Sequence, residues 1–167
     1  MIHKERADVI ERVRQLDQTV LLPVVREVMK DDSVNHVPGW TAAPIGTSIA
    51  VGTLGIFKVS GEVATGTGKK RWSVVAKAMD LAATSDHAAH TSPDREIIAY
   101  ESGLLAQIGS TTANGRQLRA AKHYGIHEMT DMGTILWVED LSAAPPIPWD
   151  DETLLEIVRQ VGQFNGH

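Results

Sequence analysis

The pattern of hydrophobic and polar residues changes twice along this chain. Residues 4–16 and 19–30 place apolar side chains at helical spacing among polar and charged ones, so we expect two helices there. From residue 45 to residue 79 the period becomes that of a strand, and glycines interrupt it repeatedly. Residues 93–108 return to helical spacing. The chain therefore predicts helices first, and then a sheet with a further helix inserted in its sequence.

Strand-like segments occur on both sides of that third helix. We expect strands at 45–51, 55–64, 71–79, 118–129 and 134–141. Residues 31–44 contain prolines and a glycine, so they predict a connector whose Trp40 packs back on the domain. After residue 141, three prolines end the sheet, and Asp150 opens a final amphipathic helix. The pattern as a whole predicts an α+β fold.

Composition narrows the class of protein. The chain has 167 residues, which suits one domain with a sizeable core. A formal net charge of −5 argues against a general nucleic-acid or anionic-membrane binder, because both need a basic surface. The absence of cysteine excludes disulfides, thiolate nucleophiles and cysteine-ligated metal sites. The amino end lacks the apolar core of a signal peptide, and no apolar run could span a bilayer, so we expect a cytoplasmic protein.

The most informative single residue is Lys77, which interrupts the apolar run 72–79. An ammonium buried without a partner is costly, so a carboxylate partner is expected. The following helix offers Glu96 and Glu101. Steps of 100° per residue place Glu101 in the apolar stripe and Glu96 on a second edge, so spacing does not decide between them. Either one could also be a solvated helix carboxylate.

A glycine-rich turn is expected between the first two strands, and it contains Gly52, Thr53 and Gly55. Glycine removes the side chain that keeps backbone amides away from an anionic ligand. Any β-hairpin also favours glycine, so the pattern alone leaves open whether this turn binds phosphate.

Three other candidate motifs carry little weight. Gly66–Lys70 looks like a P-loop, but that motif needs a glycine at position 63 and a serine or threonine at position 70. The histidine pairs His87/His90 and His123/His127 lack further ligands of the usual kind, so no metal site is expected. Lys69–Arg71 is the only dense basic cluster, and a solvated hairpin tip explains it.

Taken together, the order and spacing of these elements resemble one family. They look like the N-terminal lobe and hinge of the aminoglycoside/choline-type small-molecule phosphotransferases, which share the protein-kinase-like fold. The stretches that carry the resemblance are Gly55–Gly61, Trp72–Lys77, Arg95-Glu96 with Tyr100 and Leu104-Leu105, Trp137–Leu141 and Gly162–Gly166.

The resemblance also implies how the chain is divided. Residues 1–44 would be a helical segment and connector, and residues 45–141 a kinase-like N-lobe. That lobe would have a five-stranded antiparallel sheet and one packed helix. Residues 142–167 would be the linker and first helix of a C-terminal lobe that is missing from this sequence.

The resemblance assigns ATP as the cofactor. It implies that Lys77 contacts the α- and β-phosphates and that Glu96 fixes Lys77 by an ion pair. It favours Glu96 over Glu101, because the family's glutamate follows an arginine and precedes a tyrosine by four positions. The remaining cofactor-binding residues that it implies are Gly52, Thr53 and Gly55 over the phosphates, and Glu139 and Leu141, whose backbone would hydrogen-bond adenine.

The sequence also departs from the family pattern. The family's catalytic aspartate lies in a His-Gly-Asp-type loop and a later aspartate holds magnesium, whereas none of the seven histidines here precedes Gly-Asp. No catalytic or metal-binding residue is therefore assigned, and Mg²⁺ is expected only with the missing lobe. The chain by itself is not expected to transfer phosphate, because that reaction depends on the metal and the aspartate.

Three hypotheses follow from the sequence. The first is an ATP-binding lobe of a phosphotransferase, which would bind nucleotide. It would be either a truncated gene product or half of a split enzyme whose partner chain carries the C-terminal lobe. The second is a non-catalytic protein-interaction module derived from that lobe. The third is an unrelated α+β domain, in which Lys77 would matter only for stability.

Overall fold

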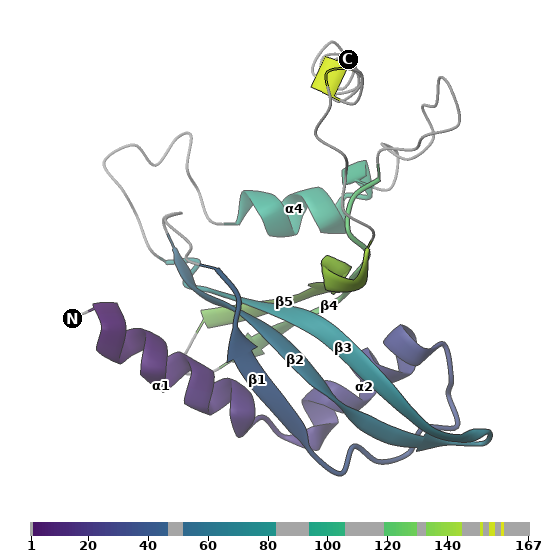
Figure 1. Cartoon of the computed structure of the whole chain (residues 1–167). Helices are drawn as coiled ribbons and strands as arrows, with labels where there is room; N and C mark the ends of the chain where they lie inside the picture. Colours follow the sequence, from purple (N-terminus) through teal and green to yellow (C-terminus); the bar gives the residue numbers. More distant parts are fainter. Residues whose placement is uncertain are drawn as a thin grey trace. The chain divides into compact units, whose positions relative to one another are not determined.

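The computed structural model of the chain describes residues 2–46, 52–82, 94–105, 119–129 and 133–144, together with residues 151, 154, 155 and 158. These residues form a mixed α+β structure with a five-stranded antiparallel sheet (Figure 1). The chain divides into two compact units. The first comprises Met1–Ile98 and Ala121–Asp140, and the second comprises Ala99–Ala120 and Leu141–His167.

Two helices open the first unit, as the periodicity predicts. Helix α1 is Ile2–Arg14 and helix α2 is Gln18–Met29. Asp17 caps α2, because its carboxylate accepts a hydrogen bond from the Thr19 N–H at 2.7 Å. At the other end, Lys30 takes the left-handed conformation with φ 51° and donates its N–H to carbonyls of the last turn.

The sheet follows in the order β1-β2-β3-β5-β4. Its strands are β1 Trp40–Pro44, β2 Thr53–Thr65, β3 Gly68–Met79, β4 His123–Met129 and β5 Gly133–Glu139. Strands β2 and β3 form one long hairpin, and helix α4, Arg95–Glu101, lies in the connection from β3 to β4. This topology makes β3 the central strand.

The first strand does not lie where the sequence pattern placed it. We expected a connector over 31–44 and a strand over 45–51, but β1 is Trp40–Pro44, and Ile45 and Gly46 follow it without strand structure. Residues 47–51 lie outside the described part. The short strand was missed because it ends in proline, which lacks an N–H to donate and is tolerated at the edge of a sheet. The packing of Trp40 is confirmed, since its indole N–H donates to the Val13 carbonyl at 3.1 Å.

Two later elements are shorter than expected. Helix α4 ends at Glu101, and Gly103 has a φ of 72°, so the helix predicted over 93–108 does not run unbroken. The strand predicted over 118–129 begins only at His123. The strand predicted over 134–141 is confirmed as β5, but it ends at Glu139, and Leu141 belongs to the 3-10 helix that follows.

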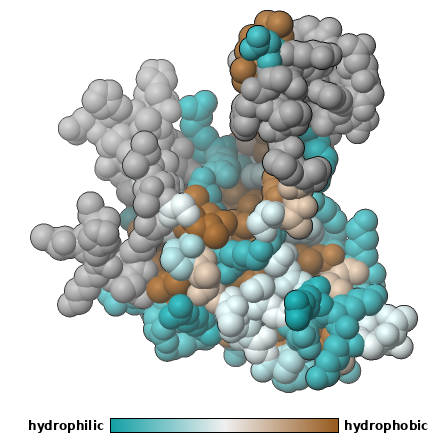
Figure 2. Space-filling model, viewed as in Figure 1, coloured by the Kyte–Doolittle hydropathy of each residue, from teal (hydrophilic) through white to brown (hydrophobic). Residues whose placement is uncertain are grey.

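A single hydrophobic core lies between one face of the sheet and the two N-terminal helices. Helix α1 contacts β1 and β2, and α2 contacts β3 and β4, so the two helices cover the same side of the sheet (Figure 1). The largest fully buried side chains of this core are Phe57, Leu21, Ile135 and Trp137. The lower part of the view in Figure 2, over these helices and the β2–β3 hairpin, is mainly hydrophilic. The apolar stripe of each helix is therefore turned inward.

The second unit has less described structure. It contains the end of α4, the short 3-10 helix Leu141–Ala143, and helical residues at Asp151, Leu154, Leu155 and Val158. Leu155 is 71% exposed and Val158 is 68% exposed. Among the helices that the structure describes, none is long and apolar enough to cross a membrane.

The β4–β5 hairpin gives a test of the sheet. Replacing Gly133 by alanine should lower the free energy of unfolding by about 2 kcal/mol or more, because Gly133 has a φ of 84° and an added Cβ would lie 2.1 Å from the Met79 carbonyl oxygen. Urea denaturation followed by tryptophan fluorescence measures this change. Gly66→Ala is the control, since no heavy atom lies within 4 Å of its added Cβ. Equal losses in the two variants would contradict the packing of Gly133 against β3.

Candidate functional site

The sheet has a second face, opposite the two N-terminal helices, which we call the outer face. Residues directly opposite each other in an antiparallel sheet point to the same side. The two rows that define the outer face across β2, β3 and β5 are Ile56–Lys77–Leu136 and Lys58–Val75–Val138. The intervening row, Phe57–Ala76–Trp137, belongs to the core. The outer face therefore carries two lysines among apolar side chains.

Lys77 forms an ion pair with Glu96 of α4 on this face. The Lys77 side chain is 20% exposed and the Glu96 side chain is 38% exposed, so the pair is partly withdrawn from water but open to it on one side. Ile97, which is buried, anchors the same turn of the helix. Glu101 is exposed at the end of α4. Helical spacing left open whether Glu96 or Glu101 pairs with Lys77, and in the structure the partner is Glu96.

The period of β3 explains why a lysine occurs in this apolar run. Trp72, Val74, Ala76 and Ala78 alternate into the core, and the residues between them turn to the outer face. Lys77 therefore takes an outer position by register alone. Its neighbours in the row are apolar, and they restrict the water around its ammonium group. A partly desolvated cation interacts more strongly with an anion than one in open solvent does.

Of the three residues predicted in the glycine turn, only Gly52 lies in a turn. Thr53 and Gly55 belong to β2, where they pair with Met79 and Ala78. Gly52 precedes the strand with a φ of 75°, and its carbonyl accepts the Asp80 N–H at 2.7 Å. An added Cβ on Gly55 would lie 2.4 Å from the Phe57 ring, so core packing already requires a glycine there. Contact of these three residues with phosphate stays a prediction.

The predicted hinge residues are divided between the two units. Glu139 ends β5 in the first unit, and Leu141 begins the 3-10 helix in the second. The Glu139 N–H donates to the Lys122 carbonyl at 2.8 Å, and the Glu139 carboxylate accepts the Lys122 N–H at 3.1 Å. The Glu139 N–H is therefore already paired within the sheet edge.

Lys122 also ties this strand end to α2. Its ammonium lies 2.6 Å from the Glu27 carboxylate and 5.2 Å from the centre of the Tyr124 ring. The hydrogen bond from Lys122 lowers the pKa of Glu27 from its ordinary value of 4.5, and the same bond raises the pKa of Lys122. Because the folded-state pKa of Glu27 is the lower one, stability from this pair is present above pH 4.5 and is lost as the pH falls through the lowered value.

A second ion pair crosses the outer face, and the sequence pattern did not indicate it. The Lys58 ammonium lies 2.7 Å from the carboxylate of Asp140, whose side chain is only 6% exposed. These residues are far apart in sequence, so only the pairing of β2 with β3 and of β3 with β5 brings them together. The one available signal was the period of β2, which places Lys58 on the same face as Lys77.

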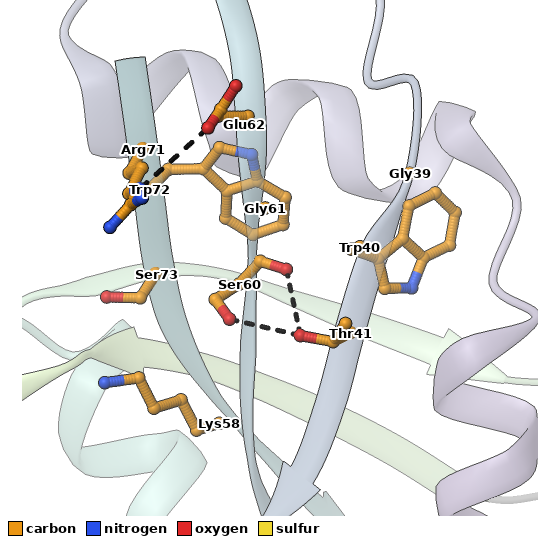
Figure 3. Close-up of a pocket in the computed structure, with 10 residues that line it drawn as sticks. All are labelled: Gly39, Trp40, Thr41, Lys58, Ser60, Gly61, Glu62, Arg71, Trp72 and Ser73. Atoms are coloured by element: carbon orange, nitrogen blue, oxygen red, sulfur yellow. Dashed lines mark hydrogen bonds and ion pairs between the residues drawn. The ribbon is translucent and has the colours of Figure 1, made fainter.

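Beyond Lys58 the outer face is hollowed into an open groove of about 620 Å³ (Figure 3). It is lined by Gly39, Trp40, Thr41, Lys58, Ser60, Gly61, Glu62, Arg71, Trp72 and Ser73. The Thr41 and Ser60 hydroxyls lie 3.3 Å apart, and Arg71 lies 3.9 Å from Glu62. Lys77 does not line this groove, so the two features are separate parts of the same face.

Metal-binding residues do not gather in the described part of the chain. Within those residues, no group of three or more histidine, aspartate or glutamate side chains could hold an ion. His123 and His127 lie on β4. The pair His87 and His90 lies outside the described residues.

Comparison of the chain with protein-family models, curated proteins and solved structures finds no significant match. The function therefore has to be argued from the residues of the outer face.

A double-mutant cycle measures the strength of the central ion pair. Lys77→Met, Glu96→Gln and the double variant should give a coupling energy of about 1 kcal/mol in the free energy of unfolding, because the pair is only partly screened by water. The coupling should shrink in high salt. Arg71 and Glu62 supply the matched control, since Arg71 is 91% exposed and should show almost no coupling. The same small value for both pairs would mean that Lys77 and Glu96 do not interact in solution.

Proposed function

We propose that this chain is the ATP-binding lobe of a small-molecule phosphotransferase. The observation that carries the proposal is the ion pair between Lys77 of β3 and Glu96 of α4. In protein kinases, a lysine on the third strand contacts the α- and β-phosphates, and a glutamate on the following helix holds that lysine in place. Here the lysine likewise lies on the third strand, and the helix lies between the third and fourth strands.

The local chemistry supports binding of phosphate at Lys77. An ammonium group has three donors, and a pairing with Glu96 uses one of them. Glu96 holds the side chain in one orientation, so less conformational entropy is lost when an anion binds. The partial exposure of Lys77 leaves an approach from solvent. A surface lysine without these neighbours would bind phosphate far more weakly.

The rest of an ATP molecule would extend along the same face. Val75 lies two residues from Lys77 on β3, a separation of about 7 Å along the strand. Val75 and its row neighbour Val138 are the apolar residues against which a base would lie. The end of β5 would supply a backbone contact from Glu139. Gly52, Thr53 and Gly55 lie at the far ends of the paired strands β2 and β3, beside the phosphate end.

Phosphoryl transfer needs groups beyond these. An aspartate base and a metal-binding aspartate would have to position the acceptor and Mg²⁺. We propose that a C-terminal lobe supplies both groups and the substrate pocket. The chemistry contributed by the described residues is the binding and orientation of the nucleotide.

A protein-interaction module is the second candidate function. Exposed apolar side chains favour it, since Ile98 is 54% exposed and Leu155 is 71% exposed. Under this alternative the chain would form a stable complex with a partner protein, and ATP would not change the affinity of that complex.

Nucleotide binding tests the proposal directly. Isothermal titration with ATP should give a measurable Kd, and Lys77→Met should weaken it at least about 10-fold, because a charge-assisted hydrogen bond to phosphate is lost. Lys69→Met is the control, since it removes the same charge from the exposed β2–β3 hairpin. It should leave the Kd nearly unchanged.

Two results would refute the proposal. One is a folded wild-type chain that binds neither ATP nor inorganic tripolyphosphate. The other is a wild-type chain that binds either ligand with an affinity that Lys77→Met does not alter. Circular dichroism of each variant separates loss of binding from loss of folding.

A further inference from the structure

The ion pair between Lys58 and Asp140 lies across the outer face at the place where a base would bind. Lys58 is opposite Val75, and Val75 is opposite Val138 near the end of β5. Two strand spacings separate β2 from β5, a distance of about 10 Å. Asp140 follows Glu139, which is opposite Val74, so the ion pair crosses β3 diagonally beside Val75. The Lys58 side chain extends sideways from β2 in Figure 3.

Burial at this position agrees with that path. Asp140 is 6% exposed at its side chain, Lys58 is 35% exposed, and Val75 is buried at 8%. The apolar stem of a lysine can cover a neighbouring side chain while its ammonium reaches a carboxylate. The charged bridge thus runs beside the apolar surface of Val75, which is buried, and Val138, which is half-buried.

We propose that the Lys58–Asp140 ion pair closes the base end of the nucleotide site and has to open before ATP can bind fully. This inference rests on the proposed function, because it takes Lys77 as the phosphate contact. The phosphate end is not closed by the bridge, since Lys77 lies in the next row of the outer face and pairs with Glu96. A ligand without a base should therefore bind without opening the bridge.

The Lys58–Asp140 ion pair and the base compete for the same surface, and this competition determines whether removing the ion pair raises or lowers the affinity for ATP. The measured affinity for ATP equals the intrinsic affinity multiplied by the fraction of molecules in which the bridge is open. Removing the bridge raises that fraction to one. The loss of a cation near the triphosphate would by itself weaken ATP binding. Tighter binding after removal of Lys58 can therefore arise only from the opened face.

The experiment compares two ligands on the full chain. Lys58→Met should tighten ATP binding by about 5-fold, the factor that corresponds to a partly exposed ion pair. The same variant should leave the affinity for inorganic tripolyphosphate unchanged or slightly weaker. Arg71→Met is the matched control, because it removes one positive charge from the same strand pair at a site remote from Lys77. That control should not tighten ATP binding.

A second variant keeps the test decisive if Lys58→Met does not fold. Asp140→Asn breaks the bridge from its other end and leaves the cation in place. Both ligands gain equally from the removal of a negative charge, and ATP gains in addition because the base end of the site is opened. Asp140→Asn should therefore improve ATP binding by a larger factor than it improves tripolyphosphate binding. An equal gain for both ligands would overturn the inference.

The remaining outcomes separate this inference from the proposed function. If Lys58→Met leaves ATP binding unchanged or weaker while Lys77→Met still weakens it at least about 10-fold, the bridge does not close the site and the proposed function stands. If Lys58→Met weakens tripolyphosphate as strongly as ATP, Lys58 is a phosphate contact and the inference is wrong. If neither ligand binds to the wild type or to either Lys58 or Asp140 variant, both proposals are refuted.

Discussion

The side chains of β3 have to serve both faces of the sheet, and this requirement organises the first unit. The strand lies in the middle of the sheet, so it cannot leave one edge unpaired. On one face it packs against α2, and on the other it carries Lys77 toward Glu96. A slip of one residue in its register would turn the lysine into the core and expose Val74 and Ala76. The register of β3 therefore determines both which side chains enter the core and that Lys77 faces Glu96.

The ion pairs of the first unit differ in their surroundings, and that difference separates their roles. Lys122 and Glu27 are both about half-exposed and join α2 to the strand end before β4. Lys77 and Glu96 are partly desolvated on the outer face, and the side chain of Asp140, which pairs with Lys58, is almost completely buried. Desolvation strengthens the attraction within a pair, and it also raises the cost of leaving either partner alone. An anionic ligand would therefore change the energy of the two outer-face pairs more than that of the Lys122–Glu27 pair.

The fold could be predicted from the sequence wherever a long element has a clear period. Helices α1 and α2, the β2–β3 hairpin and β5 follow directly from apolar residues spaced at the helical or strand period. Strand β1 could not be predicted, because five residues that end in proline carry too little periodic signal, and their strand structure depends on pairing with β2. The end of α4 was placed too late, since leucines beyond Gly103 continue the helical spacing although the backbone at Gly103 turns away.

The candidate site shows the same division between local and non-local information. The sequence by itself determined that Lys77 lies on a buried strand and needs a carboxylate, because the period of the strand and the cost of an unpaired ammonium are local properties. Only the tertiary structure decided that Glu96 is the partner, because helical spacing places Glu96 and Glu101 on different edges without saying which edge meets the sheet. Only the tertiary structure brought Lys58 to Asp140, because that contact depends on how β2 and β5 pair with β3, and strand pairing is not encoded in the spacing of either residue.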